Sequence, residues 1–403
     1  MILTEWLDEI PDDWACVPAW SLFSERADKA EPDAVHLTPS QAYGVLPQTE
    51  YMEIAGSRVV LNLTGADKMK AVYEGDFISH LRSFQGGLEQ SSLRGKVSQA
   101  YTVLRPSPLV QSGYFRYLMK SRIFIEQLNN LTDQLRDGQT INYARFARMG
   151  LPLPPLESQR IIAQYLDHET YEIDAMLAKL DVLNEALNSR RASVVERETI
   201  ARSGSLTRLK FCADISLGKT FQGVRKSDHE TSVNYIRAAS IQPSCLELDD
   251  QRMWMTREEQ RKYDLRKGDV LVVEGGAGFG RSAHLAQDMP GWGFQNHVIR
   301  VRPDQHHDGR FLNYCVKGHY SSGLIGLLAD GATIPGLSSD KAKNLPIPDM
   351  SLEEQQRIAD HLDEVTGRID AMLATIDELK ALLVERRAAL ITDVVTGRKK
   401  VPA

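Results

Sequence analysis

One glycine-rich segment has nearly the spacing of a phosphate-binding loop. Gly275-Gly276-Ala277-Gly278-Phe279-Gly280-Arg281-Ser282 follows a predicted strand and approaches the pattern G-x-x-x-x-G-K-[ST], with arginine in place of lysine. Such a loop holds phosphates only where a helix begins directly after it. Here only Ala283 to Asp288 precede Met289-Pro290-Gly291, which leaves no room for that helix. We therefore expect a plain tight turn, or a close approach of the backbone to a partner.

Other catalytic patterns are incomplete. An adenine methyltransferase usually carries Asn/Asp-Pro-Pro-Tyr/Phe, whereas Leu153-Pro154-Pro155-Leu156 lacks both the polar first residue and the aromatic last one. Asp269 and Glu274 have no Glu-x-Lys companion of the nuclease type, and the 10 histidines and 4 cysteines show no metal-ligand spacing. The sequence therefore predicts no catalytic residue and no metal site, and an enzyme with an unrecognised site is the least favoured alternative.

Two long polar connections carry side chains suited to nucleic-acid bases and phosphates. They run from Arg82 to Gln99 and from Gly275 to Gln295, and both are longer than packing alone requires. Arginine reads guanine, and asparagine or glutamine reads adenine, through paired hydrogen bonds. The same residue types also populate ordinary surface loops. The candidate DNA-binding residues are Arg82, Ser83, Gln85, Arg94, Lys96, Ser98, Gln99, Tyr101, Arg281, His284, Gln295, Asn296 and His297.

Charge is unevenly distributed along the chain. Residues 66–148 hold 12 Lys/Arg against 7 Asp/Glu, although the whole 403-residue chain has a net charge of −6. Basic surface attracts phosphate even when acidic surface lies on separate elements. The N-terminus does not resemble a signal peptide, and no apolar run approaches the ~20 residues of a membrane-spanning helix. We expect a cytoplasmic protein without a membrane partner.

An internal repeat is the main organising feature of the chain. Without gaps, residues 159–192 match residues 355–388 at 18 of 34 positions, an offset of 196. Weaker echoes precede each copy, such as Gly75-Asp76 with Gly268-Asp269 and Arg105-Pro106 with Arg302-Pro303. The repeat predicts a globular unit followed by a helix, twice over. We expect these boundaries: 1–150, 151–203, 204–346 and 347–403.

The repeated segments have the periodicity of long helices. Prolines precede both copies, and apolar residues recur at alternating three- and four-residue steps, as in a coiled coil. We expect the two helices to pair antiparallel, with one globular unit at each end and a pseudo-two-fold relation between the halves. The expected seam comprises Leu166, Ile173, Met176, Leu180, Leu183, Leu187, Leu362, Ile369, Met372, Ile376, Leu379 and Leu383.

The globular units have the pattern of mixed α/β domains, so the fold class is α+β. Residues 59–63, 100–104, 269–273 and 296–301 are predicted strands, and helices are expected near 113–136 and 309–328.

The whole pattern resembles the specificity subunits of type I restriction-modification systems. The resemblance rests on Leu151-Pro152-Leu153-Pro154-Pro155-Leu156-Glu157-Ser158-Gln159 and its echo Leu345 to Gln355, on the Arg-Arg-Ala triplets, and on Leu390 to Gly397. Ile10-Pro11-Asp12-Asp13-Trp14 is similar to the opening of the first target recognition domain. The resemblance is specific in the helices and loose in the globular units.

The resemblance implies a non-catalytic subunit with two target recognition domains, each reading one half of a bipartite site in double-stranded DNA. The helices would set the spacer and dock two methyltransferase (M) subunits, and restriction/motor (R) subunits would join for cleavage. S-adenosylmethionine, ATP and Mg²⁺ are expected on those partners, with no cofactor in this chain. A coiled-coil scaffold with two protein-binding heads and no DNA binding is the alternative.

Overall fold

The computed structural model describes all residues except 1–6, 8–9, 57–68, 81–86, 131–142, 203, 244, 277, 329–335 and 403. The chain forms two compact units. Unit 1 comprises residues 1–179 and 379–403, and unit 2 comprises residues 180–378. The unit boundaries cross the two long helices, α6 (Leu156–Glu198) and α11 (Leu352–Val395), so each unit contains part of both. The sequence-based division instead gave each helix a segment of its own.

Unit 1 is built around a four-stranded antiparallel sheet. Its strand order is β2 (Phe23–Glu25), β9 (Val103–Pro106), β6 (Phe77–Ser79), β7 (Leu88–Gln90). Three strand pairs accompany it: β1 (Ala15–Pro18) with β10 (Gly150–Leu153), β3 (Leu37–Ser40) with β4 (Gly44–Pro47), and β5 (Lys70–Val72) with β8 (Gly95–Val97). The helices outside α6 and α11 are α1 (Ala19–Leu22), α2 (Gln48–Ala55), α3 (Ser112–Leu118), α4 (Arg122–Asn130) and α5 (Tyr143–Phe146).

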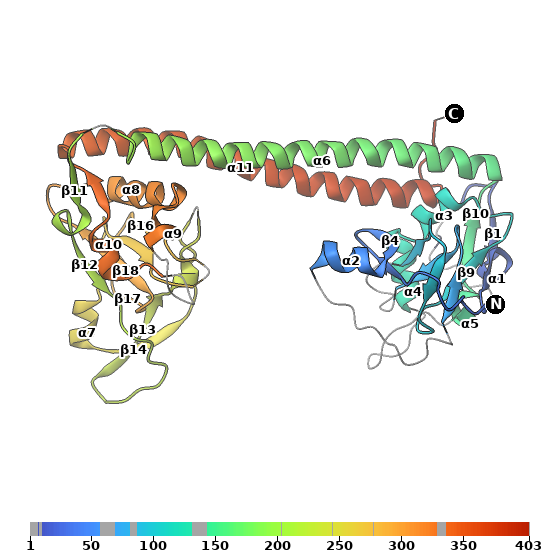
Figure 1. Cartoon of the computed structure of the whole chain (residues 1–403), viewed down its shortest axis with the longest axis horizontal. Coiled ribbons are helices and arrows are strands. Elements are labelled where there is room, and N and C mark those ends of the chain that lie inside the picture. Colours follow the sequence, from blue (N-terminus) through green and yellow to red (C-terminus); the bar gives the residue numbers. More distant parts are fainter. Residues whose placement is uncertain are drawn as a thin grey trace. The chain divides into compact units, whose positions relative to one another are not determined.

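Unit 2 repeats this frame. Its four-stranded sheet has the order β12 (Ala213–Leu217), β18 (Val298–Pro303), β15 (Val270–Val273), β16 (Ser282–His284), and β11 (Leu206–Arg208) pairs with β19 (Pro346–Pro348). A second sheet, β14 (Arg252–Thr256), β13 (Glu230–Ile236), β17 (Trp292–Phe294), differs from anything described in unit 1 (Figure 1). The shorter helices are α7 (Arg257–Lys262), α8 (Gly309–Ser321), α9 (Leu324–Leu328) and α10 (Ser339–Lys343).

Burial of apolar side chains joins each sheet to the long helices. In unit 1, the Phe23 ring of β2 lies 5.3 Å from that of Phe115, edge to face. The neighbouring Tyr114 is fully buried, and its hydroxyl donates to the carbonyl of Val395 in α11 at 2.7 Å. In unit 2, one core cluster combines Val270 of β15, Phe311 of α8 and Leu362 of α11, all fully buried. Apolar burial of this kind is the main stabilising term of a domain. Each globular part is therefore fixed on its own stretch of the helix pair.

The predicted strands and helices are mostly confirmed. Strands cover most of 269–273 and 296–301, helices occupy 112–118, 122–130, 309–321 and 324–328, and β9 begins three residues later than expected. The predicted strand at 59–63 lies outside the described residues. The prediction of continuous polar connections is wrong, because 82–99 contains β7 and β8, and 275–295 contains β16 and β17. These strands are three residues long, too short to give a periodic signal.

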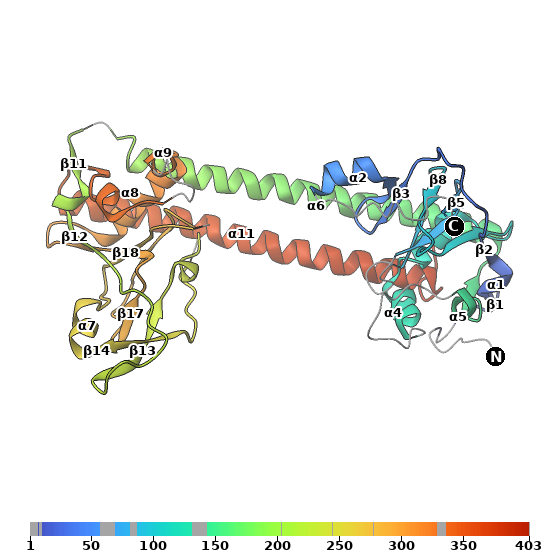
Figure 2. The same ribbon diagram turned by 60° about the horizontal axis from the view of Figure 1, so that its bottom comes forward.

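Within each unit the parts of α6 and α11 lie side by side (Figure 1 and Figure 2). Six predicted seam residues are buried, namely Leu166, Ile173, Leu362, Ile369, Ile376 and Leu383. Leu180 and Leu187 are half-buried. The other four are exposed, contrary to prediction: Met176 (48%), Leu183 (46%), Met372 (54%) and Leu379 (44%).

The seam takes the alternative three-four register. The residues turned inward are Leu177 and Asn184 on α6, and Leu373 and Lys380 on α11, each one position beyond an exposed member of the predicted set. Both registers share every second residue, so apolar periodicity alone does not separate them. The ion pairs Arg191–Asp370 and Arg387–Asp174 are made in the observed register and distinguish it from the predicted one.

Candidate nucleic-acid interface

Ion pairs tie the two helices together in the same way in both units. In unit 2, Arg191 Nη1 of α6 lies 2.9 Å from Asp370 Oδ1 of α11. In unit 1, Arg387 Nε of α11 lies 3.1 Å from Asp174 Oδ1 of α6. Arg191 and Arg387 are repeat equivalents, as are Asp174 and Asp370. The two helices therefore exchange one contact reciprocally, as an antiparallel pair of repeats must.

A buried glutamine fastens each globular part to the beginning of its helix. Gln159 Oε1 accepts the backbone N–H of Gln111 at 2.8 Å, and its Nε2 donates to two backbone carbonyls. Gln355 Oε1 accepts the backbone N–H of Asp308 at 3.0 Å, and its Nε2 also donates to two carbonyls. Both glutamines are fully buried. A buried amide is tolerated because all its hydrogen bonds are made.

A tyrosine makes a second equivalent contact about two helical turns later. The Tyr117 hydroxyl donates to Asp167 Oδ1 at 2.6 Å, and the Tyr314 hydroxyl donates to Asp363 Oδ1 at 2.8 Å. The threonine three residues beyond each aspartate lies 3.1 Å and 3.0 Å from the respective phenol oxygen. Burial raises the pKa of both tyrosines. They remain neutral donors at physiological pH, so the anchor is not a titrating site.

The structure groups three predicted residues of unit 2 beside residues from two other loops. Gln295, Asn296 and His297 follow β17, and the Asn296 backbone N–H donates to the carbonyl of Lys219 at 2.9 Å. His297 Nδ1 lies 3.6 Å from Glu274 Oε2. The His297 side chain is exposed, while Gln295 and Asn296 are half-buried. Amide and imidazole groups thus meet at one surface, with hydrogen-bonding capacity suited to base edges.

The two other predicted residues of unit 2 line separate cavities. His284, in β16, lines one of about 840 Å³ together with Arg266 and Arg310, and burial lowers the pKa of its imidazole. Arg281 lines a smaller one of about 250 Å³, where its Nη1 lies 3.4 Å from Gln242 Oε1. The structure therefore does not gather these two residues with those after β17.

In unit 1 the predicted set is only partly described. Arg82, Ser83 and Gln85 lie outside the described residues. Arg94 is exposed, and its guanidinium lies 5.1 Å from the centre of the Tyr73 ring. Ser98 is half-buried and Gln99 is exposed.

Two members of the set in unit 1 belong largely to the interior. Lys96 is only 5% exposed, and its ammonium donates to the carbonyl of Pro32 at 2.6 Å. Contrary to expectation, Lys96 is a structural residue, because its β8 position turns it inward. Tyr101 is half-buried beside an apolar cluster, and burial raises its pKa.

One exposed segment was missed by the sequence analysis. Residues 218–227 of unit 2 expose Phe221 (48%) and Val224 (75%) next to two cations, Arg225 and Lys226. The Arg225 guanidinium lies 5.7 Å from the centre of the Trp254 ring. Exposed cations beside aromatic groups are typical of nucleic-acid surfaces. In the sequence, this segment is marked by the basic residues between Gly218 and the beginning of β13.

The glycine-rich segment does not lead into a helix in the described residues. The segment that follows Gly280 enters strand β16 rather than a helix, so the helix end that binds phosphates in a nucleotide loop is not built. Among the described residues no three His, Cys, Asp or Glu side chains gather as metal ligands, and no helix is long and apolar enough to cross a membrane.

Comparison with known proteins shows what the chain is similar to. Residues 214–381 match the family described as "Type I restriction modification DNA specificity domain". This part of the chain is similar to such a specificity domain. The match covers most of unit 2, from β12 to α11.

Relatives and solved structures extend the likeness beyond the specificity domain. The chain is 25% identical over 291 residues to the type I restriction enzyme StySPI specificity subunit of Salmonella potsdam, an alignment covering 67% of this chain and 61% of the relative. The fold matches a chain of a type I R-M system structure with a TM-score of 0.72 (16% identity, 97% of this chain, 100% of that one).

A second structure, the HsdS subunit from Thermoanaerobacter tengcongensis, matches with a TM-score of 0.61 and 16% identity over 98% of this chain and 100% of that one. The resemblance to specificity subunits noted in the sequence is therefore confirmed, as is the α+β fold with two long helices. At such low identity the solved structures establish the fold alone. Unit 2 and unit 1 share the same frame of strands and helix contacts.

Proposed function

We propose that this chain is the DNA-reading, non-catalytic specificity subunit of a type I restriction-modification complex. One observation carries the proposal: two different globular parts are mounted on one helix pair through the same glutamine and tyrosine contacts. Duplicated mounting with diverged loops is what a reader of two unlike half-sites requires. The similarity of residues 214–381 to a specificity domain supports the same conclusion.

In this proposal each unit reads one half of a bipartite site in double-stranded DNA, and the paired helices set the unread spacer. In unit 2 the surface that includes Gln295, Asn296 and His297, together with residues 218–227, is the candidate reading face. Its amide and imidazole groups suit base edges, and its exposed cations suit phosphates.

The helices would also dock two methyltransferase subunits, with motor-nuclease subunits joining for cleavage. Both helices expose large apolar side chains, among them Met176, Val182, Met372 and Leu382. Exposed apolar side chains on an otherwise charged helix are suited to a protein partner. S-adenosylmethionine, ATP and Mg²⁺ would be bound by those partners, and no cofactor by this chain.

A methylation map of the genome tests the proposal directly. N6-methyladenine would be mapped in the native host with and without this gene. Loss of methylation at one bipartite motif after deletion is the expected result, and it would identify both half-sites together. Unchanged methylation, in a host whose partner subunits are shown to be expressed, would count against the proposal.

The alternative function is a coiled-coil scaffold with two protein-binding heads. Retention of the purified chain on duplex DNA at increasing salt separates the two. Phosphate contacts make DNA affinity fall steeply with salt concentration, whereas a scaffold is not retained at any salt. The exposed basic segment 218–227 favours the DNA-reading function over the scaffold.

A further inference from the structure

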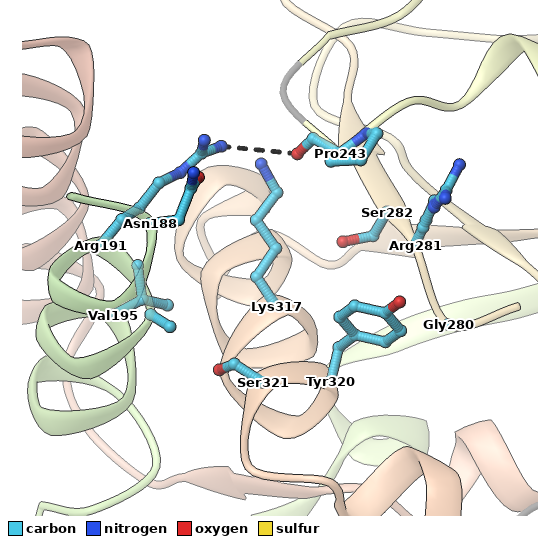
Figure 3. A pocket seen from close by; sticks show the side chains of 11 residues that line it. Asn188, Arg191, Val195, Pro243, Gly280, Arg281, Ser282, Lys317, Tyr320 and Ser321 are labelled. Atoms are coloured by element: carbon cyan, nitrogen blue, oxygen red, sulfur yellow. Dashed lines mark hydrogen bonds between the residues drawn. The ribbon is translucent and has the colours of Figure 1, made fainter. Parts of the chain in front are cut away.

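Unit 2 contains a cavity of about 250 Å³ bounded by α6, α8 and the start of β16. We call it the cationic cavity, because Arg191, Arg281 and Lys317 line it. Figure 3 shows Lys317 rising from α8 between Arg191 on one side and Ser282 on the other, with the Tyr320 ring below. Basic, hydroxyl and aromatic side chains thus line the same cavity.

Among the described residues, no carboxylate lies in direct contact with the ammonium of Lys317. In the part of the chain that the structure describes, its Nζ makes neither a hydrogen bond nor an ion pair. The ammonium lies 5.9 Å from the centre of the Tyr314 ring. Burial lowers the pKa of Lys317, and the charge of Arg191 lowers it further, whereas the charges of Asp370 and Asp363 raise it in part. A half-buried ammonium that no carboxylate contacts directly has lost part of its hydration, so an anion in the cavity would be stabilised there.

Two further groups are prepared for a ligand. Ser282 is 3% exposed, and its Oγ has no hydrogen-bond partner in the part of the chain that the structure describes. Figure 3 shows this oxygen pointing into the cavity toward Lys317. Arg191 is held in place by Asp370 and by a hydrogen bond of 3.4 Å to the carbonyl of Pro243. A buried hydroxyl without a partner is uncommon in a folded protein and often marks a missing ligand or water.

The corresponding lysine of unit 1 is neutralised within the chain. Lys120 stands three residues after Tyr117, as Lys317 stands three residues after Tyr314. Lys120 Nζ lies 2.9 Å from Glu89 Oε1, a carboxylate that is itself buried. The helix ends before Lys120 in unit 1, whereas α8 continues through Lys317 in unit 2. Within the described parts of the two units, the lysine of unit 1 therefore contacts a carboxylate directly, whereas the lysine of unit 2 does not.

We propose that the cationic cavity binds the phosphate of a nucleotide. A phosphate offers several acceptor oxygens, which suit an ammonium, a guanidinium and a hydroxyl acting together. The Tyr320 ring, 46% exposed, and the Pro243 face provide an apolar wall for the attached sugar or base. A free nucleotide and a DNA backbone both carry this phosphate group. Binding of a DNA backbone phosphate rests on the proposed function.

The first arm of the test uses the purified full-length chain with inorganic phosphate and with AMP. Calorimetric titration would compare the wild-type protein with Lys317→Met and Ser282→Ala. We expect Lys317→Met to weaken binding about tenfold or more, because a charge-assisted hydrogen bond is lost, and Ser282→Ala to weaken it less. Lys210→Met is the matched control, since it removes the same charge from an exposed position of unit 2.

The second arm repeats the comparison with duplex DNA. If Lys317→Met but not Lys210→Met weakens the binding of phosphate or AMP in the first arm, the ligand is a free nucleotide. If Lys317→Met weakens only the binding of duplex DNA in the second arm, the ligand is a backbone phosphate. Equal behaviour of the two variants in both arms overturns the inference, whether the cavity is empty or takes an acidic protein side chain. If the wild-type chain does not bind DNA at all, the proposed function fails, while the first arm still decides the cavity.

Discussion

The two units hold an equivalent buried aspartate by different arginines. Asp76 and Asp269 each follow a glycine with positive φ, and each is 1% exposed. In unit 1 the partner is Arg26, at 2.7 Å, and in unit 2 it is Arg302, at 2.8 Å. Arg105, the repeat equivalent of Arg302, is exposed. The buried carboxylate requires a cation, but either of two neighbouring strands can supply it.

This difference shows that the contacts to the long helices are kept in both copies of the repeat, whereas the contacts away from the helices vary. The contacts to α6 and α11 are made by the same residue types in both copies, namely glutamine, tyrosine, aspartate and threonine. Away from the helices, even a buried ion pair is rebuilt from another strand, and unit 2 adds a whole second sheet. The mounting is therefore preserved while the parts that face outward diverge, as two readers of different sequences would require.

The largest expected effect comes from breaking the helix seam. In Ile369→Asp with Leu373→Asp, two carboxylates replace inward-facing apolar side chains on α11. We expect unit 2 to lose about 4 kcal/mol or more of unfolding free energy, because an unpaired charge is buried. Urea unfolding measures the loss, and the methylation map would then show no bipartite motif.

A matched variant tests the register of the seam. Met372→Asp with Leu379→Asp adds the same charge to the same helix at positions that are 54% and 44% exposed. We expect each exposed substitution to change stability by about 0.5 kcal/mol or less. If this variant unfolds as readily as the first, the helices pair in the register predicted from apolar periodicity, and the register described above is wrong.

The seam also illustrates what the sequence could and could not predict. The repeat and the 3.5-residue period were sufficient to predict two long helices and their pairing. They did not fix the register, because Arg191 and Arg387 occupy seam positions that an apolar pattern excludes, and their ion pairs were invisible without the fold. The strands at 269–273 and 296–301 were found because their β-branched runs are buried, whereas three-residue strands gave no pattern.

An intermediate effect is expected from the aspartate comparison. Arg302→Ala leaves Asp269 buried beside an empty position, and we expect a loss of about 3 kcal/mol in unfolding free energy. Arg105→Ala, at the equivalent but exposed position, is expected to cost about 0.5 kcal/mol or less. Arg26→Ala supplies the counterpart in unit 1 and should resemble Arg302→Ala. Equal, small losses for Arg302→Ala and Arg105→Ala in urea unfolding would refute the exchange of partners.

The candidate interface was less predictable than the fold. Residue type alone nominated Lys96, which β8 turns into the interior. It missed Lys317, whose place in the proposed site depends on its spatial neighbours. Whether an arginine or lysine is available to a ligand depends on its neighbours in space, which a single sequence does not reveal. The exposed segment 218–227 was the exception, since its basic residues beside glycine were visible in the sequence.

The smallest expected effect concerns acid. His319 of α8 is 2% exposed and donates from Nε2 to the carbonyl of Pro346 at 2.6 Å. Burial lowers its pKa from the ordinary value near 6.5, and the hydrogen bond raises it in part. The unfolded chain then binds more protons than the folded one, so stability is present above about pH 6.5 and falls as the pH drops through that range. The equivalent position in unit 1 is Arg122, which is exposed.

Urea unfolding at pH 7.5 and pH 5.5 would compare the wild-type chain with His319→Gln. Glutamine can still donate to the Pro346 carbonyl but does not titrate, so we expect it to reduce the stability lost on acidification. The scale is set by about 1.4 kcal/mol for each unit of pKa shift. His284 and His36, whose pKa values burial also lowers, continue to titrate in the variant and leave a residual slope. An unchanged loss in His319→Gln would mean that His319 does not resist protonation, and that the acid response comes from other groups such as His284.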